Sequence, residues 1–125
     1  MRVPILKQRN FLIASIQSAL SDEDLQNLRQ DLVEQIGRHR SRGAIVDVTV
    51  LDVMDSFAVR TLRAIAHMIR VRGAQTVIVG IQPEVAFAMV QLGLTLEDVA
   101  TALDLEEGLA YLDNKIKGGT ARHAR

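Results

Sequence analysis

The sequence lacks the residues and runs that several common classes of protein require. None of its 125 residues is a cysteine, which excludes disulfides, zinc–cysteine sites and thiol catalysis, and fits a reducing compartment. No window approaches the roughly 18 apolar residues of a membrane span. The apolar stretches at the N-terminus are short and broken by polar residues, unlike a signal peptide. We therefore expect a cytoplasmic protein without a membrane segment.

Unbalanced charge and abundant aromatic residues are also absent. Fifteen basic and 15 acidic side chains leave no net charge, so general attraction to nucleic acid or anionic lipid has no support. One Tyr, three Phe and no Trp offer little for stacking on bases. No glycine-rich phosphate-binding motif is present, so nucleotide turnover is not predicted. We expect neither a nucleic acid nor a membrane as a partner.

Apolar residues occur in short runs that alternate with helically spaced ones. The predicted strands are a closely connected pair at 3–7 and 11–16, buried strands at 44–50 and 75–81, and a short strand at 94–99. The predicted helices span about 21–36, 56–72, 83–92 and 104–116. Ser21 and Asp104 are expected to cap the first and last, and Pro83 suits the start of the third.

The order of these elements predicts an α/β fold. A strand–helix–strand crossover implies parallel pairing, whereas the connected pair at the start adds an antiparallel strand. We predict one domain over residues 1–117, with a mixed sheet and about four helices packed on it. Residues 118–125 contain two glycines and several basic side chains and are predicted to form a disordered tail.

The stretch DVMDSF, residues 52–57, places a serine between a strand and a helix. A hydrolase nucleophile would need flanking glycines in a Gly-x-Ser-x-Gly turn, and none is present. His39, His67 and His123 fall at a helix end, within a helix and in the tail, so no base is predicted for Ser56 and no enzymatic activity is expected.

The carboxylates around Ser56 have two interpretations. Asp47, Asp52 and Asp55 surround one strand end and could in principle hold magnesium, but loop and capping roles are favoured. Ser56 could cap the following helix, or Asp55 could do so and leave Ser56 exposed. An anion at Ser56 would be tolerated because it lies near free backbone amides at a helix start.

Basic residues recur along one side of the helix that follows Ser56. Arg60, Arg63, His67 and Arg70 are spaced by three, four and three residues, opposite an apolar stripe. This basic stripe is either a solvated outer face or a docking surface for an acidic partner.

Four segments, taken in order, resemble a known family. The run IVDVTVLDVMDSFAVRTL resembles the core motif of STAS domains, the anti-anti-sigma factor family. Together with it, PILKQRNFLIASIQ, GAQTVIVGIQPEVA and LGLTLEDVATALDLEEGL are similar to stressosome scaffold proteins of the RsbS type. The resemblance covers nearly the whole chain, about Val3 to Leu112.

This resemblance implies a phosphorylatable scaffold rather than an enzyme. By position Ser56 is the phosphoacceptor of a switch serine kinase of the RsbT type, which the unmodified scaffold sequesters and the phosphorylated scaffold releases. The resemblance also implies that the protein associates with itself and with RsbR-type STAS paralogues in a large hetero-oligomeric complex. Release of the kinase regulates a stress response, often through a sigma factor.

The resemblance also suggests which residues contact partners. Asp52, Asp55, Phe57 and Arg60 surround the predicted phosphorylation site, and Gln82 and Glu84 belong to a turn expected at the same sheet edge. Ala88 stands where RsbR-type proteins carry a second phosphorylatable threonine, which favours the small scaffold subunit. The alternative function is a STAS-like module that binds a small ligand or nucleotide at this edge. No resident cofactor or metal is expected for the protein.

Overall fold

A computed structural model describes the backbone of residues 2–124 and the side chains of residues 2–117. The strands are β1 (Ile5–Gln8), β2 (Phe11–Ser15), β3 (Gly43–Asp47), β4 (Gln75–Val79) and β5 (Ala100–Ala102). The helices are α1 (Asp22–His39), α2 (Ser56–Val71), α3 (Pro83–Gln91) and α4 (Leu105–Ala124).

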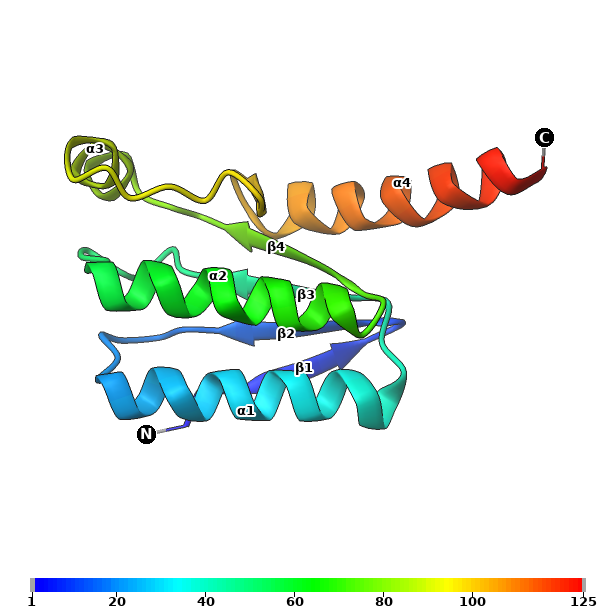
Figure 1. Cartoon of the computed structure of the whole chain (residues 1–125), viewed down its shortest axis with the longest axis horizontal. Coiled ribbons are helices and arrows are strands. Elements are labelled where there is room, and N and C mark those ends of the chain that lie inside the picture. Colours follow the sequence, from blue (N-terminus) through cyan, green and yellow to red (C-terminus); the bar gives the residue numbers. More distant parts are fainter. Residues whose placement is uncertain (1, 125) are drawn as a thin grey trace.

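The strands form a single mixed sheet in the order β1-β2-β3-β4-β5. β1 pairs with β2 in an antiparallel hairpin, and β2 to β5 are parallel to one another. The predicted α/β fold with a mixed sheet and four helices is therefore confirmed (Figure 1).

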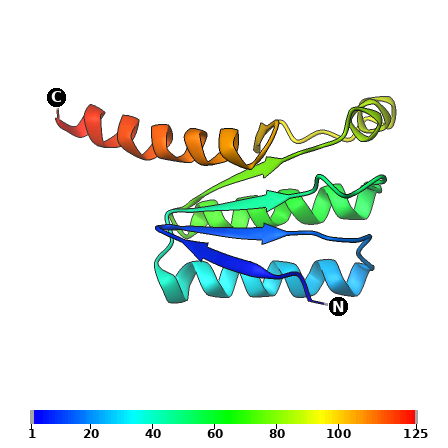
Figure 2. The same ribbon diagram turned by 180° about the vertical axis from the view of Figure 1, so that it is seen from behind.

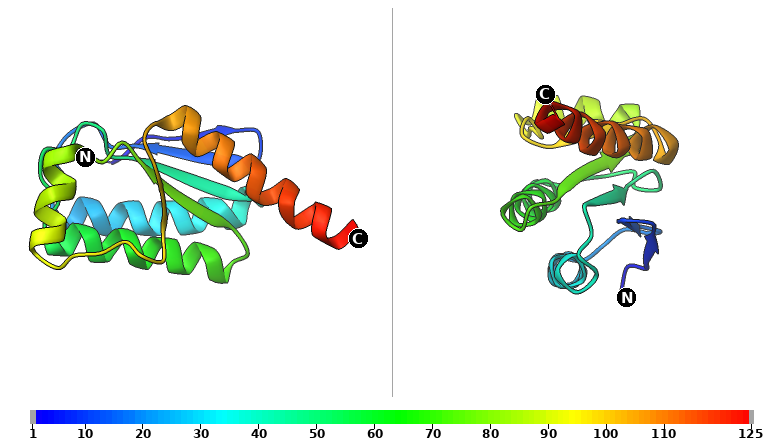
Figure 3. Two further views of the ribbon diagram at one scale, coloured as in Figure 1. Left: turned by 90° about the horizontal axis from the view of Figure 1, so that it is seen from above. Right: turned by 90° about the vertical axis from the view of Figure 1, so that its right-hand side faces the viewer.

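The two faces of the sheet are covered by different helices. Leu12 and Ala14 of β2 lie in the larger core cluster with residues of α1 and α2, whereas Phe11 and Ile13 lie in the second cluster with Leu112 of α4. This alternation follows from the two-residue period of a strand. Figures 2 and 3 show α1 and α2 side by side on one face and α4 across the other.

The first three helices begin at the edge where the parallel strands end (Figure 1). Ser21 and Asp24 form a reciprocal capping box at α1, with Asp24 N donating to Ser21 Oγ at 3.1 Å and Ser21 N donating to Asp24 Oδ2 at 3.2 Å. Pro83 is the first residue of α3, where its missing N–H costs nothing. The sequence predicted both starts correctly.

Two predictions for the C-terminal part of the chain were wrong. Residues 94–99 do not form a strand, because turn hydrogen bonds from Leu94 N to Met89 O and from Val99 N to Leu96 O hold this segment, and β5 begins at Ala100. The last helix does not end near residue 116 but continues to Ala124. Asp104 caps it as predicted, accepting from Glu107 N at 2.8 Å. The side chains of residues 118–125 lie outside those described, so the boundary at residue 117 and the disordered tail remain predictions.

Candidate functional site

Ser56 is the first residue of α2, and its neighbour caps the helix. Asp55 Oδ1 accepts a hydrogen bond from Ala58 N at 2.8 Å, so of the two capping arrangements left open by the sequence, the structure has the one with Asp55. Ser56 is exposed, and among the described residues its hydroxyl has no hydrogen-bond partner. The hydroxyl thus stands at a helix start with its oxygen available to another protein.

The loop from Val48 to Asp55, which leads to Ser56, is anchored on the hydrophobic core. β3 ends earlier than predicted because the Asp47 carboxylate accepts from both Thr49 N, at 3.0 Å, and Thr49 Oγ1, at 2.6 Å, which turns the chain. Leu51 and Met54 are buried on the core. The site is therefore a short anchored loop rather than a loose one.

The loop between β4 and α3 is hydrogen-bonded to the loop between β3 and α2. Gln82 Nε2 donates to Thr49 O at 2.7 Å across the two strand ends. Gly80 permits this approach because it has a φ of +83° and because a Cβ there would overlap Thr49 Oγ1. Gln82 is thus part of the same edge as Ser56, as the position of its turn predicted.

Among the described residues, the other predicted contact residues, apart from Asp55, have no hydrogen bond that ties them to the loop before Ser56. Phe57 is half-buried, whereas Asp52, Arg60 and Glu84 are exposed, and no hydrogen bond or ion pair between described side chains brings these three to Ser56. Asp47, Asp52 and Asp55 do not come together as a metal-binding group in the described part of the chain. Asp47 and Asp55 have the loop and capping roles instead.

Sequence reasoning missed the exposed apolar residues at this edge. Val50 and Val53 of the β3–α2 loop are 55% and 76% exposed, although Val50 was predicted to lie in a strand. On α3 the chain buries Val85 and Met89 but exposes Phe87 and Val90, and it also exposes Leu92 at the C-cap of this helix. Their spacing from Val85 and Met89 was the available signal, because Phe87 and Val90 fall off the face that those two residues share.

An apolar cavity lies beside Ser56, between the starts of α1 and α2. Its volume is about 210 Å³, and Leu20, Leu25, Val53 and Ala58 are among the residues that line it, with Asp55 at the margin. The edge therefore presents the Ser56 hydroxyl, the Asp55 carboxylate and accessible apolar surface together.

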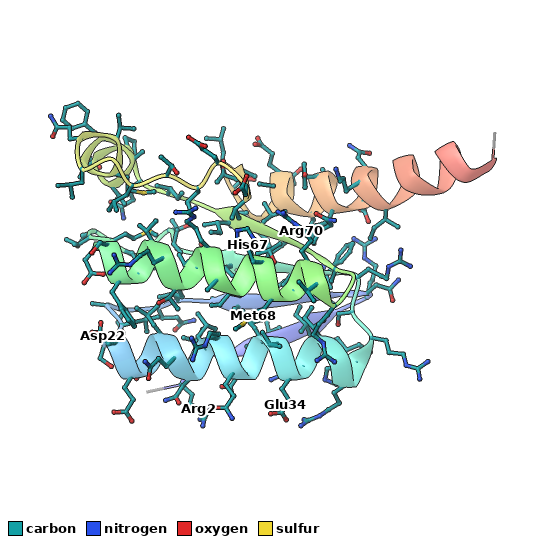
Figure 4. All side chains as sticks on the ribbon, viewed as in Figure 1. Arg2, Asp22, Glu34, His67, Met68 and Arg70 are labelled. Carbon is teal, nitrogen blue, oxygen red and sulfur yellow. The ribbon has the colours of Figure 1, made fainter. Side chains whose placement is uncertain are left out.

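The basic stripe of α2 is used within the fold in part. Arg70 donates to the backbone O of Asp98, in the connection that leads to β5, and Arg63 is half-buried. Figure 4 shows His67 and Arg70 on the side of α2 that faces away from α1, with Met68 on the side toward it. Arg60, His67 and Arg70 are exposed, so most of the stripe is a solvent-accessible face, and whether it docks a partner remains a prediction.

Comparison with known proteins decides the family. The model of the STAS domain family matches residues 2–108. The chain belongs to the STAS-domain family. An RsbS variant from Moorella thermoacetica has a similar structure, with a TM-score of 0.80, 33% identity, and coverage of 92% of this chain and 97% of that one. A chain from a structure of the stressosome, described as a signal integration and transduction hub, gives a TM-score of 0.77 at 34% identity, covering 90% of this chain and 98% of that one.

Sequence comparison adds a longer relative of this STAS domain. The RsbT co-antagonist protein RsbRA of Bacillus subtilis (strain 168) is 25% identical over 107 residues, which is 86% of this chain and 38% of that protein. The chain therefore spans well under half of the length of this curated relative. Among the described residues, no helix has both the length and the apolar character that crossing a membrane requires.

Removing the cap is expected to loosen the start of α2. Asp55→Ala should lower the free energy of unfolding of the STAS domain by about 1 kcal/mol, because Ala58 N loses its acceptor. Asp55→Asn is the matched control, since its amide oxygen can still accept and should retain most of the stability. Urea unfolding measures both changes. Equal losses for Ala and Asn would show that charge, rather than the capping hydrogen bond, stabilises the helix start.

Proposed function

We propose that this STAS domain is a non-enzymatic, phosphorylatable scaffold of a stressosome. In its unmodified form it sequesters a switch serine kinase of the RsbT type, and phosphorylation of Ser56 releases the kinase to act in a stress response. The observation that carries the proposal is the exposed Ser56 hydroxyl at the start of α2, left without a capping role by Asp55.

The described roles of the similar proteins support this proposal. RsbS and a stressosome chain share both fold and about a third of the sequence, and RsbRA is named as a co-antagonist of RsbT. RsbR-type STAS paralogues are the expected partners in a large complex, together with further copies of this chain. The exposed Phe87, Val90 and Leu92 provide apolar surface that such assembly could cover.

The chemistry of the modification belongs to the kinase. The Ser56 oxygen attacks the γ-phosphorus of ATP, its proton passes to a base of the kinase, and ADP leaves. Ser56 needs only to be reachable, and the anchored Val48–Asp55 loop presents it in a fixed place. The helix N-terminus then favours the added negative charge.

Incubation with the cognate switch kinase and ATP tests the proposal. We expect one phosphate on the wild-type chain, mapped by mass spectrometry to Ser56, and no incorporation into Ser56→Ala. Ser21→Ala is the matched control, because Ser21 also precedes a helix at this edge but uses its hydroxyl in a capping box. It should be phosphorylated like the wild type. A phosphate on Ser21, or continued incorporation into Ser56→Ala, would refute the assignment.

A further inference from the structure

Three arginines line a cavity at the end of the sheet opposite Ser56. Arg40 and Arg42 lie in the connection from α1 to β3, and Arg72 lies at the end of α2. With Ile36, Gly37, Ser41 and Gly73 they line a cavity of about 280 Å³ that is open to solvent, and all three arginines are exposed. None of these lining residues carries a carboxylate, although the chain as a whole has no net charge.

The guanidinium groups of Arg40, Arg42 and Arg72 form no ion pair with any described residue. Backbone amides already close both helix ends: Ser41 N donates to Ile36 O at 3.1 Å, and Gly73 N donates to Arg70 O at 2.9 Å. Arg2, Arg9 and Arg38 each pair with a carboxylate, but among the described residues Arg40, Arg42 and Arg72 form no such pair. The cavity thus gathers positive charge that no carboxylate among the described side chains pairs with.

A buried hydroxyl in the same cavity also lacks a partner. Ser41 is 6% exposed, and its Oγ forms no hydrogen bond with any described residue. Buried hydroxyl groups are normally hydrogen-bonded, so an isolated one calls for an explanation. Ser41 lies between Arg40 and Arg42 in the cavity lining, and rotation of its side chain toward the cavity would let the hydroxyl donate to an anion bound there.

Gly37 gives the Arg72 guanidinium its position. A Cβ at Gly37 would overlap Arg72 Nη2 and would lie 3.0 Å from Arg72 Cζ. Glycine within a helix is unfavourable relative to alanine, yet here it lets the guanidinium lie against the end of α1. Arg72 is thereby held over the same short segment that carries Arg40 and Ser41.

We propose that this cavity binds a phosphate monoester or inorganic phosphate. Guanidinium groups match the oxygens of phosphate with paired N–H donors, and several of them together neutralise a dianion. Once its side chain turns toward the cavity, the Ser41 hydroxyl adds a neutral donor. The ligand bridges the α1–β3 and α2–β4 connections, and this site is separate from the kinase-facing edge and does not depend on the function proposed for Ser56.

Titration of the full chain with inorganic phosphate, followed by ¹⁵N NMR, tests this site. We expect saturable shifts at the amides of Ser41, Arg42 and Gly73 that chloride at matched ionic strength does not produce. Arg72→Gln should weaken the affinity about tenfold or more, because a charged hydrogen-bonding partner is lost. Arg38→Gln is the matched control, because Arg38 lies near this end of α1, pairs with Glu34 and does not line the cavity. It removes the same charge and should change the affinity by less than about threefold.

Gly37→Ala separates binding from stability. The new methyl group should displace the Arg72 guanidinium and weaken phosphate binding, while the unfolding midpoint stays the same or rises because alanine favours a helix. A phosphoserine peptide of residues 52–60 serves as a second probe and distinguishes a phosphorylated protein from a free phosphate as the source. Absence of saturable shifts with both probes, or equal losses in Arg38→Gln and Arg72→Gln, would overturn the proposal.

Discussion

Ser56→Asp should weaken binding of the switch kinase about tenfold or more, and phosphorylation of Ser56 should weaken it further. Ser56 is exposed beside Asp55 and close in sequence to Asp52, so a kinase surface that fits the hydroxyl would have to bury an added anion near carboxylates. An interface charge buried without a partner costs about 2 kcal/mol or more, which corresponds to about thirtyfold in affinity. The kinase should therefore dissociate because binding would bury the added negative charge without a partner.

The domain itself should remain folded after this change. Negative charge at a helix N-terminus is favoured by about 0.3 to 1 kcal/mol, which offsets repulsion from the neighbouring carboxylates in water. We expect the urea midpoint of Ser56→Asp to match that of the wild type. This places the effect at the interface rather than in the fold.

Calorimetric titration of each variant with the kinase, in the absence of ATP, measures this effect. Ser56→Ala should bind like the wild type, because it removes the hydroxyl without adding charge. Ser56→Asn is the matched control, since it has nearly the size of Asp but no charge. If Asn weakened binding as much as Asp, size would be responsible, and if Asp bound as tightly as the wild type, local charge would not be the release mechanism.

The sequence predicted the elements whose signals are local. Ser21 and Asp104 cap helices, and Pro83 begins one, because each of these effects depends on residues within one turn. The parallel core followed from the order of strands and helices. Ser56 at the start of α2 followed from the resemblance together with the capping residues around it.

The rest depends on contacts between distant segments. β5 begins at Ala100 because that residue pairs with Val77, which the sequence of 94–99 alone could not reveal. Which apolar residues of α3 are exposed depends on which side of the helix packs on the core, and this is set by the rest of the fold. Likewise Arg40 and Arg72 are separated along the chain, and only the parallel sheet brings the ends of α1 and α2 together. No local pattern in the sequence therefore indicates that these arginines line one cavity.

Gly80→Ala should lower the free energy of unfolding by about 3 kcal/mol. About 1 kcal/mol comes from placing a side chain at a φ of +83°, and the remainder from overlap with Thr49, whose Cα would lie 3.1 Å from the new Cβ. Gly73→Ala is the matched control, because Gly73 has a similar φ of +91° but nothing within 4 Å of its Cβ position. It should lose only about 1 kcal/mol. Urea unfolding of the two variants isolates the overlap.

The overlap should also reach the phosphorylation site. Thr49 begins the loop that presents Ser56, and its carbonyl accepts from Gln82, so a displaced Thr49 would disturb both loops of the site. Under conditions in which both variants are folded, the kinase should phosphorylate Gly80→Ala more slowly than Gly73→Ala. Thr49→Ala in the Gly80→Ala background removes the nearest hydroxyl and should recover part of the stability and rate. Equal phosphorylation rates for the two glycine variants would mean that the kinase phosphorylates Ser56 whether or not these loops keep their fixed conformation.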